Sequence, residues 1–366
     1  MKLKIKTITC HEVYNYGAIL QEYALVEYLK TIGYDASTIH YKPYHINFFN
    51  FWEVPQKWNS NFFFKYLYLV LKLPKRIINL RRKKAFDLFS DEYLNVDSRV
   101  YIDNEDLKKN LPAADVFICG SDQIWNSYYE TGRDPSFYLD FVPDNVKKIS
   151  YAASFALDEI EEEYKSFVKE KVGRINHISV REESGKKILE NLNIKNVTQV
   201  IDPVFLLDEE HWKQKFISSS SEDFILIYDF DNNQLIKKLA LELAQKKNYK
   251  IYTVNENIKY ADKNYYLKGP KVYLSLMYNA KYVITNSFHS VAFSLIFNKQ
   301  FLVVNRTEAI NTRMRDLLGL FNLSQLLVSE GFSIEEIKTI NFEEVNKLKQ
   351  TAIDNAKEFL TNALQS

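Results

Sequence analysis

The sequence predicts an α/β protein built from two Rossmann-like domains that face each other across a cleft. Its 366 residues are long for one hydrophobic core and suit two domains of ordinary size. Strand-like runs alternate with helix-like stretches along most of the chain, a pattern typical of parallel sheets covered on both faces. Polar residues or glycines follow several of the strand-like runs, which places a ligand cleft at the carboxyl ends of the strands.

The first series begins with a β-α-β unit. Gly33 ends its first helix, and two further apolar runs and a helix resume the pattern after a long interruption. We therefore expect an N-terminal domain over residues 1–172 with an insertion at 42–109. The predicted elements are strands at 3–10, 34–41, 114–119 and 148–153, and helices at 18–32 and 159–172.

The second series starts directly after the first and has a similar length. It predicts a boundary near residue 173, a C-terminal domain over 173–335, and a final helix within 336–366 that packs back on the N-terminal domain. Its predicted elements are strands at 177–181, 197–201, 224–228, 250–254 and 280–284, and helices at 183–192, 234–246 and 291–297.

The bulk composition excludes several classes of protein. A formal net charge of +1 gives no global field for binding nucleic acid, and two cysteines do not make a disulfide framework. The first residues lack a continuous apolar signal core, and no apolar stretch is long enough to span a membrane. These features predict a cytoplasmic protein without a nucleic-acid partner.

The predicted insertion contains a basic amphipathic stretch at residues 62–84. Its first part is rich in Phe, Tyr and Leu, its second part in Lys and Arg, and no acidic residue follows until Asp87. This composition suits a helix that lies on the inner face of an anionic membrane, as a peripheral contact. The alternative is an ordinary buried helix whose lysines extend to solvent. Pro74 predicts that any helix here kinks or restarts.

The junction after the predicted strand at 280–284 offers a polar pocket floor. A helix that begins directly after a strand presents unpaired N–H groups and the positive end of its dipole, which favour an anion. Asn286, Ser287 and Ser290 add hydrogen-bonding groups, and His289 adds a proton carrier. The alternative is that Asn286 or Ser287 only caps the helix while His289 packs in its first turn.

Two earlier strand ends carry similar signals. Gly17, in Asn15-Tyr16-Gly17, allows the backbone to approach a ligand closely. The loop from Gly120 to Asn126 combines polar side chains with Trp125, whose indole face suits a sugar ring. Alternatively, the residues of either segment could only form a turn, without binding a ligand.

Taken together, the motifs resemble the polysaccharide pyruvyl transferase family over roughly residues 10–320. The resemblance implies a fold like that of the B-type glycosyltransferases. It also implies transfer of the pyruvyl unit of phosphoenolpyruvate to two hydroxyls of a sugar in a cell-surface polysaccharide precursor, such as a capsule or exopolysaccharide. The N-terminal domain would form the acceptor side and the C-terminal domain the donor side. The motifs are those at 15–18, 120–126, 151–155, 178–182, 202–206 and 285–290.

The resemblance also assigns roles to residues. His289 and Arg181 are the expected catalytic residues, and the scheme needs no cofactor or metal. Many family members have an arginine where this chain has Ser287, so Arg306, Arg313 or Arg315 would have to supply the missing charge. The expected substrate-binding residues are Asn15, Tyr16, Gly17, Gly120, Ser121, Asp122, Gln123, Trp125, Asn126, Asn286, Ser287, Ser290 and Arg313.

Phosphoenolpyruvate and a glycan acceptor, free or lipid-linked, are the expected partners, and two rival functions stay open. One is a glycosyltransferase that uses a nucleotide sugar, because the same fold serves both reactions. The other is a non-catalytic scaffold of polysaccharide assembly that binds a membrane through residues 62–84. Asp229-Phe230-Asp231 looks like an Asp-x-Asp metal motif but fits an ordinary loop better.

Overall fold

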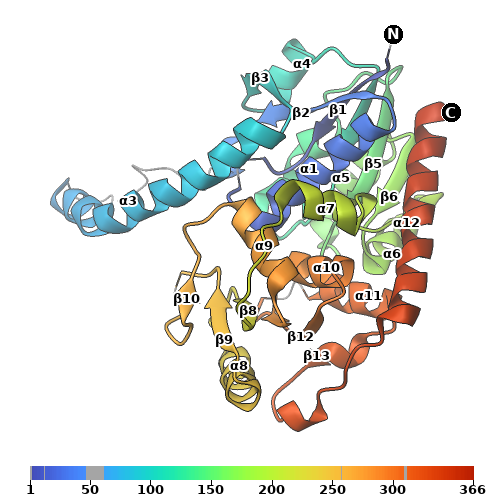
Figure 1. The fold of residues 1–366 in the computed structure, drawn as a ribbon. Coiled ribbons are helices and arrows are strands. Elements are labelled where there is room, and N and C mark those ends of the chain that lie inside the picture. Colours follow the sequence, from blue (N-terminus) through green and yellow to red (C-terminus); the bar gives the residue numbers. More distant parts are fainter. Residues whose placement is uncertain (1, 12, 47–61, 257, 309–310) are drawn as a thin grey trace.

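The computed structural model describes residues 2–11, 13–46, 62–256, 258–308 and 311–366, with the backbone alone at 46 and 62–64. Two β-sheets surrounded by helices form its two halves (Figure 1). Every strand pairing in both sheets is parallel. The predicted fold class, an α/β protein with two Rossmann-like halves, is confirmed.

Sheet A forms the first half and has seven strands in the order β3-β2-β1-β4-β5-β6-β7. In the middle of the sheet, Ile5 of β1 lies between Ala36 of β2 and Val116 of β4. The strands are β1 (Lys4–Ile8), β2 (Asp35–Tyr41), β3 (Val96–Tyr101), β4 (Val116–Cys119), β5 (Lys147–Ala153), β6 (His177–Val180) and β7 (Val197–Gln199).

Sheet B forms the second half and has six strands in the order β10-β9-β8-β11-β12-β13. Val283 of β11 lies between Leu226 of β8 and Phe301 of β12. The strands are β8 (Phe224–Tyr228), β9 (Lys250–Thr253), β10 (Lys263–Asn264), β11 (Tyr282–Thr285), β12 (Gln300–Val304) and β13 (Leu327–Val328).

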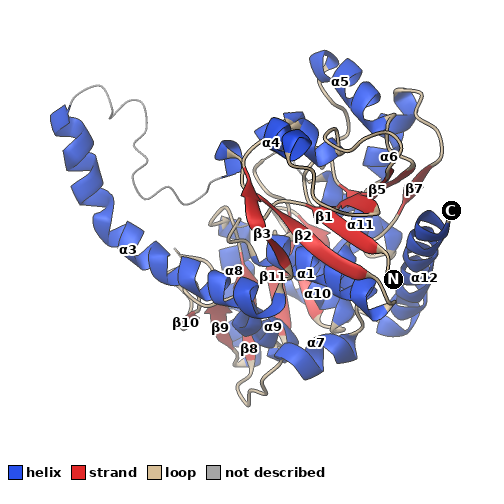
Figure 2. Ribbon diagram, turned by 90° about the horizontal axis from the view of Figure 1, so that it is seen from above, coloured by secondary structure: helices blue, strands red, loops and turns tan. Residues whose placement is uncertain are grey.

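The helices connect the strands and cover the sheets (Figure 2). They are α1 (Tyr16–Thr31), α3 (Phe62–Tyr93), α4 (Asn104–Lys109), α5 (Glu162–Val172), α6 (Glu183–Asn191), α7 (Glu209–Phe216), α8 (Gln234–Lys247), α9 (Pro270–Asn279), α10 (Phe288–Ile296), α11 (Thr312–Leu320) and α12 (Phe342–Gln365).

Both sheets reverse their strand order at an equivalent place. In each, the first strand lies between the second and the fourth, so β1 neighbours β4 and β8 neighbours β11. In open α/β sheets, the crevice beyond the carboxyl ends of two such strands is where ligands bind. The topology therefore marks four loops, those after β1, β4, β8 and β11, as the place to look for a site.

The expected domain boundary near residue 173 does not match the structure. β6 pairs with β5, and β7 pairs with β6, so both strands belong to sheet A. Sheet B begins only at Phe224. The segment between the sheets contains α7 and the 3-10 helix η4 (Pro203–Leu206), which packs beside α1. The local pattern of a short apolar strand does not reveal which sheet it joins.

The expected insertion at 42–109 is only partly a separate feature. Its residues 47–61 lie outside the described part of the chain, while β3 pairs with β2 as the edge strand of sheet A. α3 continues through Pro74, where the sequence predicts a kink or a restart. Proline removes only one backbone hydrogen-bond donor, and the helical turns on either side keep their own donors. The helix therefore does not restart there.

α12 runs from the second half back along the first (Figure 1). At its end, Lys147 Nζ of β5 donates to the Ser366 carbonyl oxygen at 2.8 Å. The Ser366 hydroxyl also lies 2.9 Å from His177 Nε2 of β6. The C-terminus is therefore attached to sheet A.

Apolar packing joins the two halves around α1. Tyr16 of α1 stacks on Tyr273 of α9 with ring centroids 4.6 Å apart. Tyr23, also of α1, packs edge-on against Phe216 of α7 at 5.3 Å. One buried cluster runs from these residues through sheet B, so the base of the cleft is closed by a core. Within the described residues, no helix is both long and apolar enough to cross a membrane.

Candidate active site

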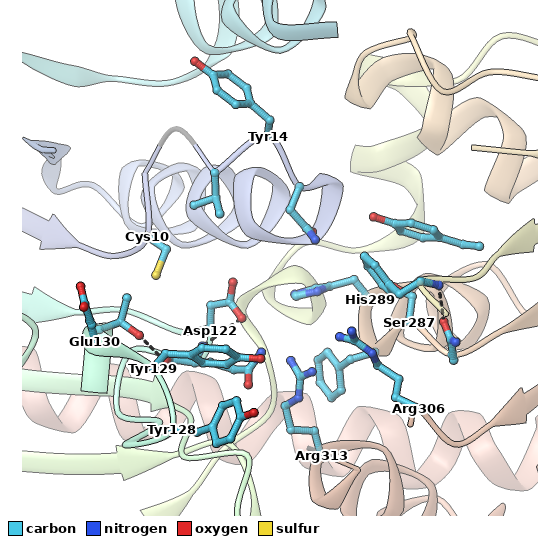
Figure 3. A pocket seen from close by; sticks show the side chains of 18 of the residues that line it. Cys10, Tyr14, Asp122, Tyr128, Tyr129, Glu130, Ser287, His289, Arg306 and Arg313 are labelled. Carbon is cyan, nitrogen blue, oxygen red and sulfur yellow. Dashed lines mark hydrogen bonds between the residues drawn. The ribbon is translucent and has the colours of Figure 1, made fainter. Parts of the chain in front are cut away.

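A cavity of about 680 Å³ lies at the carboxyl ends of the strands where the two halves meet (Figure 3). Its size is that of ordinary small-molecule sites. The loops after β1, β4, β8 and β11 all contribute to its wall, as the two strand reversals predict. The lining residues are Cys10, Val13, Tyr14, Asn15, His45, Arg82, Asp122, Gln123, Tyr128, Tyr129, Glu130, Thr131, Tyr228, Phe230, Asn286, Ser287, Phe288, His289, Arg306 and Arg313.

His289 lies in the first turn of α10 and lines this cavity, although only 6% of its surface is exposed. Ser287 is the N-cap, and its side chain accepts a hydrogen bond from Ser290 N at 3.5 Å. Phe288 and His289, the first two helical residues, have N–H groups with no carbonyl partner inside the helix. The junction thus presents an imidazole and a positive helix end to the same space.

The N-terminus of α1 meets the same histidine from the other half. Asn15 caps α1 by accepting from Gly17 N at 2.8 Å. A Cβ atom on Gly17 would lie only 1.9 Å from His289 Nδ1. Glycine is therefore required at this position because the imidazole ring packs directly on its Cα. Gly17 does not line the cavity itself, so it acts by making room for the ring.

Asp202 holds His289 and Arg181 from below the cavity. Its Oδ2 lies 3.5 Å from His289 Nε2 and accepts from Arg181 Nη1 at 2.7 Å. Ser121 donates to the same oxygen at 3.0 Å. The 3.5 Å separation is long for a hydrogen bond, and Nε2 is buried with no hydrogen-bond partner in the described part of the chain.

The buried carboxylate is charged at neutral pH. Burial alone raises the pKa of Asp202, but the His289 imidazole and the Arg181 guanidinium outweigh it and hold the pKa well below its usual range. Asp202 is fully buried and belongs to η4 as its N-cap, which fixes its position.

Arg181 does not line the cavity. Besides Asp202, it bonds Glu182 through Nε at 2.9 Å and lies over the Phe288 ring at 4.2 Å. Burial lowers the pKa of this guanidinium, but Glu182 and Asp202 raise it further, so it is always charged. The structure therefore places Arg181 as a support for Asp202 and Phe288, and not in the cavity as a catalytic residue.

Arg313, at the start of α11, supplies a cation to the cavity wall. It is 9% exposed, and no carboxylate pairs with it among the described residues. Its Nε atom has no hydrogen-bond partner there either. Burial, together with the nearby Arg181, lowers the pKa of Arg313 to about 10, so it stays charged at neutral pH. An unpaired buried cation is costly and marks a place for an anion.

The other candidate arginines differ in position. Arg306 follows β12 and lines the cavity, where Nη2 pairs with Glu308 at 2.9 Å. Arg315 points outward and pairs with Asp158 at 2.6 Å. The sequence left Arg306, Arg313 and Arg315 open as replacements for the charge absent at Ser287, and the structure brings Arg306 and Arg313 to the site.

The N-terminal side of the cavity is polar and aromatic. Asp122 has a left-handed backbone (φ 74°) and accepts from Gln123 N at 2.9 Å. Tyr128 is 63% exposed, and it lines the cavity together with Tyr129 (Figure 3). Carboxylate and amide groups beside aromatic faces are suited to a sugar.

Several residues expected to bind substrate lie in the core instead. Trp125 is 0% exposed, stacks on Tyr138 at 5.3 Å and donates to the Phe137 carbonyl, so its indole cannot stack on a sugar. Asn126 is also buried, and it holds the Gln123 side chain at 2.8 Å. Gly120 packs against Leu25 and Ser121 bonds Asp202, so neither lines the cavity.

Tyr16 and Ser290 are buried outside the cavity as well. Tyr16 Oη donates to the Lys268 carbonyl at 2.8 Å, and Ser290 Oγ lies 3.0 Å from Tyr273 Oη. The first contact joins the two halves, and the second lies within the second half. Seven of the expected residues do line the cavity: Asn15, Asp122, Gln123, Asn286, Ser287, His289 and Arg313.

The Asp229-Phe230-Asp231 segment is a turn. Asp229 accepts from Asp231 N at 2.9 Å and from Asn286 Nδ2 at 2.8 Å, which ties the loop after β8 to the loop after β11. In the part of the chain that the structure describes, no three His, Cys, Asp or Glu side chains gather as metal ligands do.

Sequence reasoning missed four residues that line the cavity or lie directly beneath it. Asp202 stands in one of the family motifs, but its contact with His289 requires the fold. Tyr128 and Phe230 are exposed aromatic residues in the loops after β4 and β8. Composition alone did not distinguish them from the other aromatic residues of the chain. Arg82 belongs to the basic stretch of α3, yet it bonds the Tyr14 carbonyl at 3.1 Å and lines the cavity.

The chain was compared with known proteins. No curated protein matches it significantly. Similar solved structures include a UDP-GlcNAc 2-epimerase from Methanocaldococcus jannaschii, with 13% identity and a TM-score of 0.45 over 97% of this chain and 93% of the other. An alpha-glucosyltransferase in complex with UDP and DNA has 9% identity and a TM-score of 0.47 over 98% and 95%. The glycosyltransferase SnogD from Streptomyces nogalater has 10% identity and a TM-score of 0.44, over 100% of this chain and 98% of the other.

These structural likenesses are too remote to say what this chain binds. The sequence family is more specific, because the model for polysaccharide pyruvyl transferases matches residues 15–308. That span contains every loop that lines the cavity except the start of α11 and the residues just after β1. The chain therefore belongs to the polysaccharide pyruvyl transferase family.

Proposed function

We propose that this protein transfers the pyruvyl group of phosphoenolpyruvate to two hydroxyls of a sugar in a cell-surface polysaccharide precursor, forming a cyclic ketal and releasing phosphate. Family membership supports pyruvyl transfer to a polysaccharide. The observation that carries the finer proposal is Arg313, a buried cation without a carboxylate partner in the described chain, in the same cavity as His289.

The donor would bind on the side formed by sheet B. Phosphoenolpyruvate carries a phosphate and a carboxylate, and it needs two positive regions close together. Arg313 offers a planar guanidinium that can hold either group through two hydrogen bonds. The N-terminus of α10 offers backbone N–H groups for the other, without any need for a charged side chain. Arg306 adds a second guanidinium to the same wall.

The acceptor would bind on the side formed by sheet A. Asp122 can accept hydrogen bonds from sugar hydroxyls, and Gln123 can both donate and accept. Asn126 fixes the Gln123 amide, so this contact is preorganised. The exposed ring of Tyr128 provides an apolar face for the sugar. This arrangement puts donor and acceptor on opposite walls of one cavity.

His289, which lines the cavity, would move protons between them. In the proposed reaction, a proton is added to the methylene carbon of the donor, and one sugar hydroxyl bonds to the adjacent carbon. Phosphate leaves with the electrons of its bond, and the second hydroxyl closes the ketal. Of the two protons that the hydroxyls lose, one balances the proton added to the methylene carbon and the other leaves with phosphate. We assign delivery of the first proton to the imidazole of His289, whose Nε2 lies 3.5 Å from Asp202 Oδ2. A well-placed general acid is worth about 100- to 10,000-fold in rate.

The test is to incubate the purified protein with phosphoenolpyruvate and a panel of free and lipid-linked glycans. Mass spectrometry would detect the pyruvate ketal, and phosphate release would be measured in parallel. We expect His289→Ala to lower the rate at least about 100-fold. His177→Ala, in a histidine that contacts Ser366 far from the cavity, is the matched control and should keep the full rate.

Ligand-induced stabilisation distinguishes the proposal from its rivals. A ligand that binds only the native state raises the unfolding temperature. Stabilisation by phosphoenolpyruvate and not by UDP- or GDP-sugars is the expected result, and the opposite result would favour glycosyl transfer. Phosphate release that depends on a glycan would exclude a non-catalytic scaffold. A protein that neither binds phosphoenolpyruvate nor modifies any glycan would refute the proposal.

A further inference from the structure

The first part of α3 projects from the body of the protein (Figure 1, Figure 2). We call residues 65–81 the projecting segment. Most of its side chains are exposed, and it holds eight of the large apolar side chains that the described chain leaves exposed. Soluble proteins seldom expose apolar side chains in such a continuous group, and where they do, the group marks an interaction surface.

Four of these eight exposed apolar residues align on one face of the helix. Tyr66, Val70, Leu73 and Ile77 follow one another at spacings of four, three and four residues, which aligns them along the helix. Their side chains are 41 to 64% exposed. The result is an exposed apolar stripe about three turns long.

Cations lie beside this stripe. Lys65, Lys72 and Arg76 are spaced by seven and four residues, so they share a second face. Lys72 and Arg76 lie over the ring of Tyr68 at 5.9 and 5.7 Å. No acidic residue occurs between 65 and 86. An apolar stripe flanked by positive charge is the pattern of a helix that lies in an anionic interface.

The remaining face of the helix is attached to the second half. Lys75 pairs with Glu256 at 2.9 Å, and Tyr266 Oη donates to the side chain of Asn79 at 3.1 Å. At 100° per residue these attachments lie opposite the apolar stripe. The helix is therefore held with its stripe turned away from the protein.

We propose that the projecting segment docks on an anionic membrane surface, with its apolar stripe at the acyl boundary and its cations at the lipid phosphates. A second copy of the chain is a poorer occupant, because it would bring the same positive charge against this face. Lipid headgroups supply the complementary charge. The rest of α3 carries Arg82 into the cavity, so docking would place the cavity near the lipid surface.

This placement identifies the class of acceptor. If the proposed pyruvyl transfer is correct, a glycan carried on a membrane lipid is the acceptor that a surface-docked cavity would reach. Only this step rests on the proposed function. Docking itself requires neither donor nor acceptor, so it can be tested alone.

The experiment measures sedimentation of the full-length protein with two kinds of vesicle, one of phosphatidylcholine alone and one with equal parts of phosphatidylglycerol. Wild type should bind the mixed vesicles and release them in high salt. Lys65→Gln with Lys72→Gln, and separately Val70→Ser with Ile77→Ser, should each lower the partition coefficient roughly tenfold or more. These positions are at least partly exposed, and circular dichroism would check that each variant is folded.

Matched controls lie elsewhere on the surface. Leu241→Ser on α8 and Lys347→Gln on α12 remove an exposed apolar side chain and an exposed cation, and neither should change vesicle binding. Equal binding of all variants, or no preference for the anionic vesicles, would overturn the proposal. A dimer in lipid-free solution that Val70→Ser with Ile77→Ser dissociates would show that a second copy covers the stripe instead. Loss of vesicle binding with unchanged phosphate release on a soluble glycan would leave the catalytic proposal standing.

Discussion

Replacing Gly17 by alanine tests the contact between the two helix N-termini at the site. The new Cβ atom would lie 1.9 Å from His289 Nδ1 and 2.3 Å from its Cγ. Ordinary contacts between such atoms are about 3.5 Å or longer, so the imidazole ring would have to move by more than 1 Å or so. Displacements of this size at a reacting group cost about 100-fold in rate.

The effect on stability can be worked out from the same geometry. Forcing an extra methyl group into a packed site costs about 1–3 kcal/mol. Alanine is otherwise better than glycine in a helix by up to about 1 kcal/mol. In a His289→Ala background the ring is absent, so Gly17→Ala should then be neutral or stabilising. The helix preference of alanine cancels between the two backgrounds, so the two substitutions should be coupled by the packing cost alone, about 1–3 kcal/mol.

The assay is urea unfolding of wild type, both single variants and the double variant. Gly319→Ala is the matched control, because that helical glycine in α11 has no atom within 4 Å of its added Cβ. It should raise the free energy of unfolding by up to about 1 kcal/mol. If the coupling between the substitutions at 17 and 289 were within about 0.5 kcal/mol, the error of additivity, the ring would not lie on Gly17 and the reasoning would be wrong.

Three more predictions follow from charges and burial. Arg313→Gln should stabilise the ligand-free protein, because burial lowers the pKa of this cation and so penalises its charge. The same substitution should weaken phosphoenolpyruvate binding at least about tenfold in a calorimetric titration. Arg315→Gln, in an exposed pair, is the control and should leave that affinity unchanged. Asp202→Asn should destabilise the protein by about 3–5 kcal/mol, since it leaves a buried cation underpaired. The pKa of Asp202 is depressed in the folded state, so its stabilisation is present above about pH 4 and is lost as the pH falls further. The free energy of unfolding of the Asn variant should therefore fall less steeply in acid than that of wild type. An acid profile equal to that of wild type would refute the assignment. Tyr128→Ala should raise the KM for the glycan without changing the unfolding temperature, whereas Trp125→Ala should lower stability by about 3–5 kcal/mol; an unaltered KM in the first would remove Tyr128 from the acceptor side.

The strands show which part of the fold a local pattern can predict. Runs of apolar residues located β6 and β7 correctly along the chain. Their assignment to the second domain was nevertheless inconsistent with the structure, because both strands pair within sheet A. Apolar periodicity reports burial of a segment, while pairing depends on contacts with strands that are distant in sequence.

Trp125 shows the same limit for the site. It stands in a loop with Asp122 and Gln123, and this composition predicted one sugar-binding surface. In the structure Asp122 and Gln123 face the cavity, while Trp125 is buried against Tyr138. Asp122 and Trp125 point in different directions because the backbone turns at Asp122, which has a left-handed conformation. The amino-acid composition of the loop does not reveal this conformation.

By itself, the sequence determined the α/β class, the family, and the junction that carries His289, because alternation, motif order and helix capping are all local properties. The tertiary structure alone decided that Arg313 lies in the cavity while Arg315 faces solvent. It also decided that Asp202 lies beneath the imidazole and that Gly17 leaves room for the ring. These are distances between segments far apart in the chain, and only the packing of two sheets around one cleft sets them.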